Sequence, residues 1–142
     1  MGDRTTVTLT VLKSQSKEAE KLFYGQWDEG FDIEQFTQYV FNDVNYGNLD
    51  ELPSLQNMGI AYNSRWDAGS DYGPGEETCR FTSEGELLIQ TIGDEYKNPC
   101  LKSLMEAINS HEMLKQIIMR HYEEVTALPW DNQEEYGKLF RA

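Results

Sequence analysis

The chain has few cysteines and no long apolar run. Only Cys79 and Cys100 are cysteines among 142 residues, which excludes a disulfide scaffold and a cysteine-based zinc ribbon. The longest apolar runs, such as residues 87–89, are very short, and the first residues carry no apolar stretch. The sequence therefore predicts neither a membrane span nor a leader peptide. We expect a soluble, cytoplasmic protein with free thiols.

Basic residues are also scarce. The chain has 12 Lys and Arg against 25 Asp and Glu, for a formal net charge of −13. Residues 22–64 contain no Lys or Arg, and residues 22–96 hold fifteen acidic residues but only two basic ones, Arg65 and Arg80. The whole excess charge thus lies in this middle segment. Nucleic acids and anionic membranes are bound through basic side chains, so we expect neither as a direct partner.

The apolar content is that of a folded protein. Hydrophobic residues make up 39% of the chain and aromatic residues 12%, enough to offset the entropy cost of ordering the backbone. A chain of this length most often forms one unit. We expect a single domain over residues 1–142.

Hydrophobic periodicity predicts the order of the elements. Alternating apolar residues indicate strands at 5–12 and 60–66, and strands at 78–82 and 86–92 form a hairpin around Gly85. Apolar residues at helical spacing predict helices at 17–24, 48–58, 98–108 and 111–127. Together these elements predict an α+β fold: an antiparallel sheet of four or five strands, helices packed on one face, and two C-terminal helices.

Several boundaries are set by individual residues. Gly25, Gly59 and Pro129 each end a helix, and Asn98 caps a helix that starts at Pro99. For residues 26–46 we favour a helical turn near Asp32 followed by a strand at 38–46, although the spacing of the apolar residues also fits a helix. The tail at 130–142 reads as a last helical turn or as an added strand.

No set of residues predicts catalysis. Cys100 lies near a helix start, which favours a thiolate, but the nearest histidine, His111, is eleven residues away, about 16 Å along a helix. His111 and His121 are too far out of register to share a metal ion. The loop at 67–75 is rich in oxygen and glycine, but Tyr72 and Thr78 occupy the calcium-loop positions of Gly and Glu. We therefore predict no catalytic residue, no metal ligand and no cofactor.

Acidic residues gather around aromatic ones in two stretches, near Trp27 and Phe31 and near Trp66 and Tyr72. Carboxylates around an aromatic anchor suit a basic, partly apolar protein surface. We interpret Trp66 as a core residue, and both interpretations stay open for Trp27 and Tyr72. The predicted partner-binding residues are Trp27, Asp28, Glu29, Asp32, Glu34, Asp43, Asp50, Glu51, Asp67, Asp71, Tyr72, Glu76 and Glu77.

The charge is of the right order to imitate a nucleic acid. A compact chain of this length is about 37 Å across, and a duplex of that length presents about eleven phosphates on one side. We hypothesise a non-enzymatic inhibitor that occludes a basic, nucleic-acid-binding protein, as anti-CRISPR and antirestriction proteins of phages and plasmids do.

Three alternatives remain open. One is a toxin-immunity protein. Another is a small metal- or ligand-binding enzyme domain with residues 67–77 as an acidic lid. The third is an assembly subunit that forms a homodimer through its C-terminal helices, including Met113, Ile117 and His121.

Overall fold

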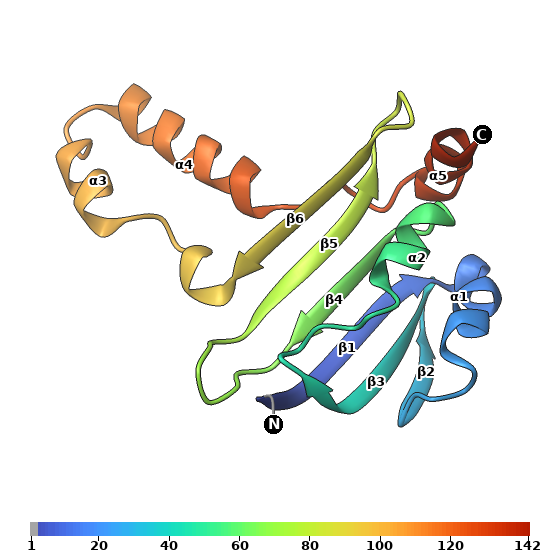
Figure 1. The fold of residues 1–142 in the computed structure, drawn as a ribbon. Coiled ribbons are helices and arrows are strands. Elements are labelled where there is room, and N and C mark those ends of the chain that lie inside the picture. The colour runs from blue at the N-terminus through green and yellow to red at the C-terminus, as the bar shows by residue number, and fades with distance from the viewer. Residues whose placement is uncertain (1–2) are drawn as a thin grey trace.

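The computed structural model describes residues 3–142 and contains six strands and five α-helices in this range (Figure 1). The strands are β1 (Arg4–Leu12), β2 (Glu29–Ile33), β3 (Phe36–Asn45), β4 (Tyr62–Trp66), β5 (Gly75–Phe81) and β6 (Leu87–Gly93). The helices are α1 (Ser16–Phe23), α2 (Leu52–Asn57), α3 (Leu101–Glu106), α4 (His111–Val125) and α5 (Gln133–Arg141). The predicted α+β class is confirmed, with one strand more than the upper end of the expected range.

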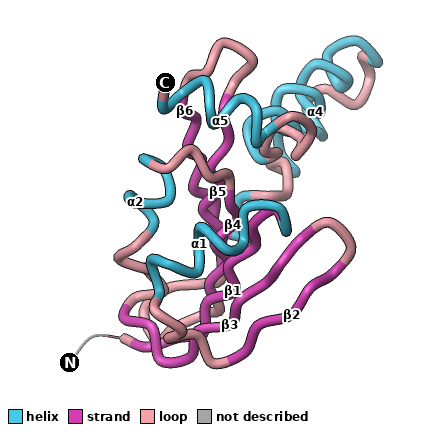
Figure 2. The backbone as a smooth tube through the Cα atoms, turned by 90° about the vertical axis from the view of Figure 1, so that its right-hand side faces the viewer, coloured by secondary structure: helices cyan, strands magenta, loops and turns pink. Residues whose placement is uncertain are grey.

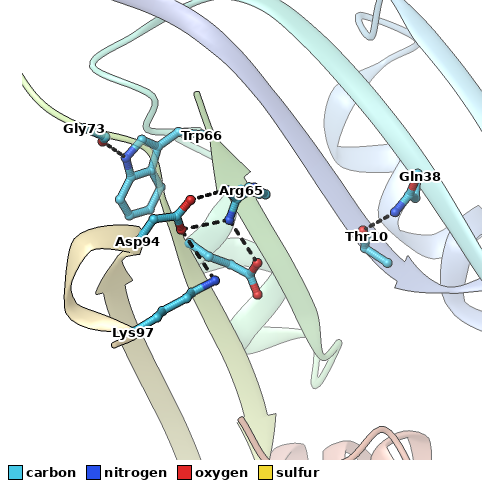
Figure 3. Close-up of polar contacts among 8 residues, drawn as sticks. Thr10, Gln38, Arg65, Trp66, Gly73, Asp94 and Lys97 are labelled. Carbon is cyan, nitrogen blue, oxygen red and sulfur yellow. Dashed lines mark hydrogen bonds and ion pairs between the residues drawn. The ribbon is translucent and has the colours of Figure 1, made fainter. Parts of the chain in front are cut away.

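All six strands form one antiparallel sheet in the order β2-β3-β1-β4-β5-β6. β1 lies inside the sheet and alternates as its sequence predicts. Its Val7, Leu9 and Val11 are fully buried, whereas Thr8 and Thr10 point to the other face and are half-buried. Gln38 of β3 donates to the Thr10 hydroxyl on that second face (Figure 3). The sheet therefore has one apolar face and one polar face.

The apolar face carries the core. α1, α2 and α5 gather on it (Figure 2) and contribute apolar side chains such as Ala19, Phe23 and Leu55. Large rings of the strands complete the cluster, and Tyr39, Tyr62 and Phe81 are almost fully buried. The remaining helices, α3 and α4, extend away from the sheet (Figure 1) and make few contacts with it.

The expected helical turn near Asp32 is wrong. Residues 29–33 form edge strand β2, which pairs with β3 through a tight turn at Glu34 and Gln35. Glu34 takes a left-handed conformation, with φ of 55°. The helical spacing of the apolar residues here is a coincidence across a hairpin, because Ile33 and Phe36 are opposite one another in the ladder. The expected strand at 38–46 is confirmed as β3.

Helix boundaries follow local chemistry, with one correction. Pro53 is tolerated because it falls in the first turn of α2. The expected start of a helix at Asn98 and Pro99 is wrong: α3 begins at Leu101 with Cys100 as its N-cap. α4 begins where Ser110 accepts a hydrogen bond from the Met113 amide (3.3 Å). The undecided tail is helix α5.

A buried arginine anchors the segment between α4 and α5 to the polar face. Arg80 of β5 is 3% exposed, and its guanidinium donates to the carbonyl oxygens of Leu128 (2.8 Å) and Tyr62 (3.0 Å). Its Cζ lies 3.8 Å from the centre of the Trp130 ring. Trp130 also packs against Phe36 of β3. The segment at 126–132 is thus fastened across the sheet before the chain passes to the apolar face.

Gln133 then fixes the start of α5. Its buried side-chain amide donates to the Phe81 carbonyl (3.0 Å) and accepts from the Phe81 amide (2.7 Å). The β4–β5 ladder ends with Tyr62 opposite Cys79. Beyond that point, the Gln133 side chain takes the place of a neighbouring strand for Phe81. Within residues 3–142, no helix combines the length and the apolar character that a bilayer crossing needs.

α5 approaches the end of α2 through two glycines. A Cβ added to Gly137 would collide with the backbone carbonyl of Gly59, whereas one added to Gly73 would meet nothing within 4 Å. We expect Gly137→Ala to lower the free energy of unfolding by about 2 kcal/mol or more, although alanine normally favours a helix. Gly73→Ala should change it by no more than about 0.5 kcal/mol. Equal effects in urea titrations of the two variants would contradict this packing.

Candidate partner-binding surface

Carboxylates gather at one end of the sheet, where β1 begins and β3 and β4 end. Backbone contacts hold the converging segments together: the Tyr46 amide donates to the Asp3 carbonyl (2.6 Å), and the Asp67 amide donates to the Thr6 carbonyl (3.0 Å). The Asp71 amide donates to the Asp3 carboxylate (3.1 Å). We call this surface the acidic end, and it comprises Asp3, Asp43, Asp50, Glu51, Asp67 and Asp71.

Further carboxylates lie along strand β2 and just before it. We call Asp28, Glu29, Asp32 and Glu34 the acidic edge, and all four are exposed. The Asp28 carboxylate accepts from the Asn42 amide (2.7 Å), immediately beside Asp43 of the acidic end. The two surfaces therefore meet at this point. Carboxylates on an edge strand also discourage pairing with other strands.

The two basic residues of the middle segment both contact other groups of the same molecule, although the Arg65 side chain stays 40% exposed. Arg80 is buried as described above. Arg65 donates to Asp94 Oδ1 (3.0 Å), is paired with Asp94 Oδ2, and lies 3.9 Å from a carboxylate oxygen of Glu76 (Figure 3). The hydrogen bonds from Arg65 hold the pKa of Asp94 below its usual range.

Two basic residues from outside the segment reach the acidic surfaces. Arg4 lies 3.9 Å from a carboxylate oxygen of Asp43, and Lys13 lies 3.6 Å from one of Asp32. Both pairs are largely exposed, so their attraction is weak and screened by salt. Asp32 also accepts from the Thr37 hydroxyl (2.7 Å). Among residues 3–142, most of the carboxylates in these two surfaces thus have no cationic partner.

The aromatic residues split between packing and exposure. Trp27 is half-buried against the Tyr39 ring, with ring centres 5.0 Å apart. Trp66 is half-buried and packs against the core, as predicted, and its indole donates to the Gly73 carbonyl (3.0 Å; Figure 3). Tyr72 is half-buried, and its ring lies 6.4 Å from that of Tyr46. Tyr46 is 57% exposed at the acidic end.

Sequence reasoning missed Tyr46 as an exposed aromatic residue. The residue follows β3 and takes a left-handed conformation, with φ of 55°. The glycine that follows, Gly47, is the sequence signal for a turn, because glycine readily adopts a positive φ. In the structure its φ is 66°.

Glu76 and Glu77 fall on opposite faces of the sheet. Glu76 lies on the polar face, opposite Arg65 in the ladder, and Glu77 lies on the apolar face, opposite Ser64. The Tyr62 hydroxyl donates to Glu77 Oε2 (2.5 Å). Burial, and then the bond to Glu77, raises the pKa of Tyr62. Glu76 and Glu77 thus lie in different environments. Of the two, Glu76 alone forms an ion pair within residues 3–142, with Arg65.

The groups that we considered for catalysis do not converge on a metal site. Within the described range 3–142, no three His, Cys, Asp or Glu side chains lie close enough to hold a metal ion. Cys79 is buried, which raises its pKa to about 12. Cys100 is exposed, and hydrogen bonds with Ser103 lower its pKa. His121, rather than His111, lines a groove with Cys100, and its Nε2 lies 2.9 Å from the Lys97 carbonyl oxygen.

Comparison of the chain with protein-family models, with curated proteins and with solved structures finds no match.

The Asp94 ion pair makes a pH-dependent contribution to stability. Because its folded pKa is lowered, the contribution is complete above the ordinary value of 3.8 and is lost as the pH falls through the folded pKa. We therefore expect Asp94→Asn to be less stable than the wild type at neutral pH, and the difference to shrink as the pH falls below about 4. Thermal unfolding over a pH series measures this difference.

Asp131→Asn serves as the control, because Asp131 has no ion pair among residues 3–142. Its stability difference from the wild type should be small throughout. A pH-independent difference for Asp94→Asn would contradict the assignment.

Proposed function

We propose that the protein is a non-enzymatic binding protein that occludes a basic protein partner through its acidic end and acidic edge. The partner is a nucleic-acid-binding protein, whose basic cleft is shaped for the same density of negative charge. The action is that of a nucleic-acid mimic or stoichiometric inhibitor, of the anti-CRISPR or antirestriction kind, in the cytoplasm. No cofactor takes part.

One observation carries the proposal: the two basic residues of the acidic segment, Arg65 and Arg80, are both turned to internal contacts. A surface built only for solubility intersperses both signs of charge. In this protein the acidic residues of the sheet give the molecular surface a net negative electrostatic potential. Such a field speeds encounter with a basic surface and repels nucleic acid.

The distribution of charge along the fold adds support. Residues 97–127, which include α3 and α4, hold four basic and four acidic side chains and are neutral as a group. The net charge of −13 therefore belongs to the rest of the chain. A basic partner is attracted to the sheet rather than to the two projecting helices.

The exposed rings supply an apolar anchor within the acidic surfaces. Tyr46 is 57% exposed at the acidic end, and Phe31 is 42% exposed beside the acidic edge. Aromatic residues within a charged rim are common among the residues that contribute most to protein binding. Trp27 and Tyr72 support these surfaces from half-buried positions.

Charge reversal tests the proposal. We expect Asp28→Lys, Glu29→Lys, Asp67→Lys and Asp71→Lys together to weaken binding of an arginine-rich peptide more than tenfold at low salt, because these carboxylates pair with its cations. Wild-type binding should weaken steeply as salt is added. Titration calorimetry at several salt concentrations measures both effects. Competition between the wild-type protein and duplex DNA for a basic nuclease then tests the partner class.

The matched control reverses four exposed acids away from these surfaces: Glu123, Glu124, Asp131 and Glu135. It changes the net charge by the same amount and should retain most of the affinity. Equal losses for the two variants, or binding that salt does not change, would overturn the proposal.

A further inference from the structure

A small pocket opens at the acidic end, on the apolar face of the sheet beyond α2. Its volume is about 190 Å³, smaller than a site for a drug-sized ligand. Ser64, Glu77 and Thr91 line it from three neighbouring strands, because Ser64 is opposite Glu77 and Glu77 is opposite Thr91 in the ladders. Tyr46, Asn48 and Trp66 also line it.

The pocket contains an unused hydrogen-bonding group. Ser64 is 1% exposed, and its hydroxyl has no hydrogen-bond partner in the described part of the chain. A buried hydroxyl without a hydrogen-bond partner destabilises the folded state, so the arrangement is unfavourable when the pocket holds no hydrogen-bonding group. An occupant that donates a hydrogen bond to Ser64 removes that cost.

The pocket also contains an anionic group, the Glu77 carboxylate, which is held in a fixed position. Glu77 Oε2 accepts from Tyr62, and Tyr62 in turn accepts from Gln56 Nε2 (2.9 Å). Within residues 3–142, Glu77 Oε1 accepts no hydrogen bond, and the lining contains no basic side chain. One carboxylate oxygen is thus available beside the unpaired hydroxyl.

The chemistry of the lining selects a cation with several donors and a flat apolar surface. A guanidinium group has five N–H donors in a plane, pairs with carboxylates and stacks on aromatic rings. The pocket offers a carboxylate, two hydroxyls and the rings of Tyr46 and Trp66. An ammonium group satisfies fewer of these groups at once.

We propose that this pocket receives the guanidinium group of one arginine side chain of the basic partner. This inference rests on the proposed function, because the pocket lies among the carboxylates of the acidic end. The acidic surfaces supply long-range attraction, and the pocket supplies a specific contact. Arginine is therefore preferred over lysine at one position of the partner.

The direct test titrates the protein with a capped Gly-Arg-Gly peptide and follows the Trp66 indole N–H by NMR. We expect saturable binding that is at least about threefold tighter than that of the Gly-Lys-Gly peptide, because only guanidinium pairs side by side with the carboxylate. The peptide with neutral citrulline in place of arginine should not bind. Equal binding of the citrulline peptide would overturn the proposal.

Adjacent glutamates provide a matched pair of variants. Glu77→Gln keeps an acceptor for Tyr62 but removes the charge, and it should weaken Gly-Arg-Gly binding about tenfold. Glu76→Gln removes the same charge on the opposite face and should change binding less than twofold. Ser64→Ala removes a hydroxyl with no partner, so the protein should stay folded while binding weakens. Equal effects of Glu76→Gln and Glu77→Gln would contradict the pocket.

The two proposals can fail separately. If a long arginine-rich peptide binds in a salt-dependent manner and Glu77→Gln leaves that binding unchanged, the pocket is wrong and the proposed function stands. If the capped tripeptide binds through Glu77 but the long peptide binds no more tightly than the tripeptide, the acidic surfaces do not attract a basic partner. The proposed function is then wrong and the pocket stands.

A second inference rests on a separate feature, the projecting pair α3 and α4. Large apolar side chains on both helices are about half exposed or more: Leu101, Met105, Ile108, Met113, Ile118, Met119 and Tyr122. Leu101 and Met105 share one side of α3, and Ile118 and Tyr122 share one side of α4, because the residues of each pair are four apart. Ile108 lies in the turn that follows α3. An apolar surface of this kind marks an interaction site.

Charge and area favour a second copy of this chain as the occupant. The two helices belong to a segment, residues 97–127, that is neutral as a group, so two copies can meet there without bringing their acidic surfaces together. Met113 lines the groove between the two helices, and the other six large apolar side chains can be covered by a partner. A surface of this extent suits one side of a standard interface, about 800 Å². We propose that α3 and α4 form the contact of a homodimer.

Sedimentation of the full chain over a concentration series tests the dimer. We expect the wild type to sediment as a dimer and Ile118→Glu as a monomer, because a buried carboxylate without a partner opposes the contact. Ile33→Glu is the matched control, since Ile33 is 45% exposed and Ile118 is 48% exposed; this variant should remain dimeric. A monomeric wild type, or dissociation caused by Ile33→Glu alone, would overturn the proposal.

Discussion

The structure depends on a buried cation, Arg80, that has no carboxylate partner among residues 3–142. The guanidinium of Arg80 donates to the carbonyls of Leu128, Tyr62 and Cys79, and Trp130 packs on it. Burial lowers the pKa of Arg80 to about 10, so the group keeps its charge at neutral pH. Because the contacts are carbonyls and a ring, the arginine joins segments far apart in sequence without using any acidic residue. Arg80 therefore neutralises none of the carboxylates of the acidic end or the acidic edge.

This anchor also separates the chain into parts of different character. The segment at 126–132 is held across the polar face, which leaves α3 and α4 on one side of the anchor and α5 on the other. Gln133 then ties α5 to the end of β5. The acidic sheet and the neutral pair of helices are thereby kept apart, so one molecule can present a charged surface and an apolar surface at the same time.

The sequence predicts those parts of the fold that depend on local pattern. β1 and the β5–β6 hairpin follow from alternation and from Gly85, and α4 follows from its apolar periodicity. β2 was not predicted, because its pairing with β3 is set by a left-handed Glu34 and not by periodicity. The projection of α3 and α4 was also not predictable, since their apolar stripes resemble those of helices that cover a core. The sequence shows how many acidic residues there are, but the face of the sheet on which each one lies depends on non-local strand pairing. Glu76 and Glu77 are neighbours in sequence, yet they lie on opposite faces of the sheet. The pocket beside Ser64 and the exposure of Tyr46 likewise depend on pairing between distant segments.

The central claim is that the acidic end is the surface that meets a basic partner. Amide hydrogen exchange of the full chain, with and without an arginine-rich peptide at low salt, tests this claim most directly. We expect slower exchange in the segments that carry the acidic end, residues 43–51 and 66–77, with no change in 101–125. We also expect added salt to remove this protection. Protection confined to 101–125, or protection of the acidic end that high salt leaves intact, would contradict the account.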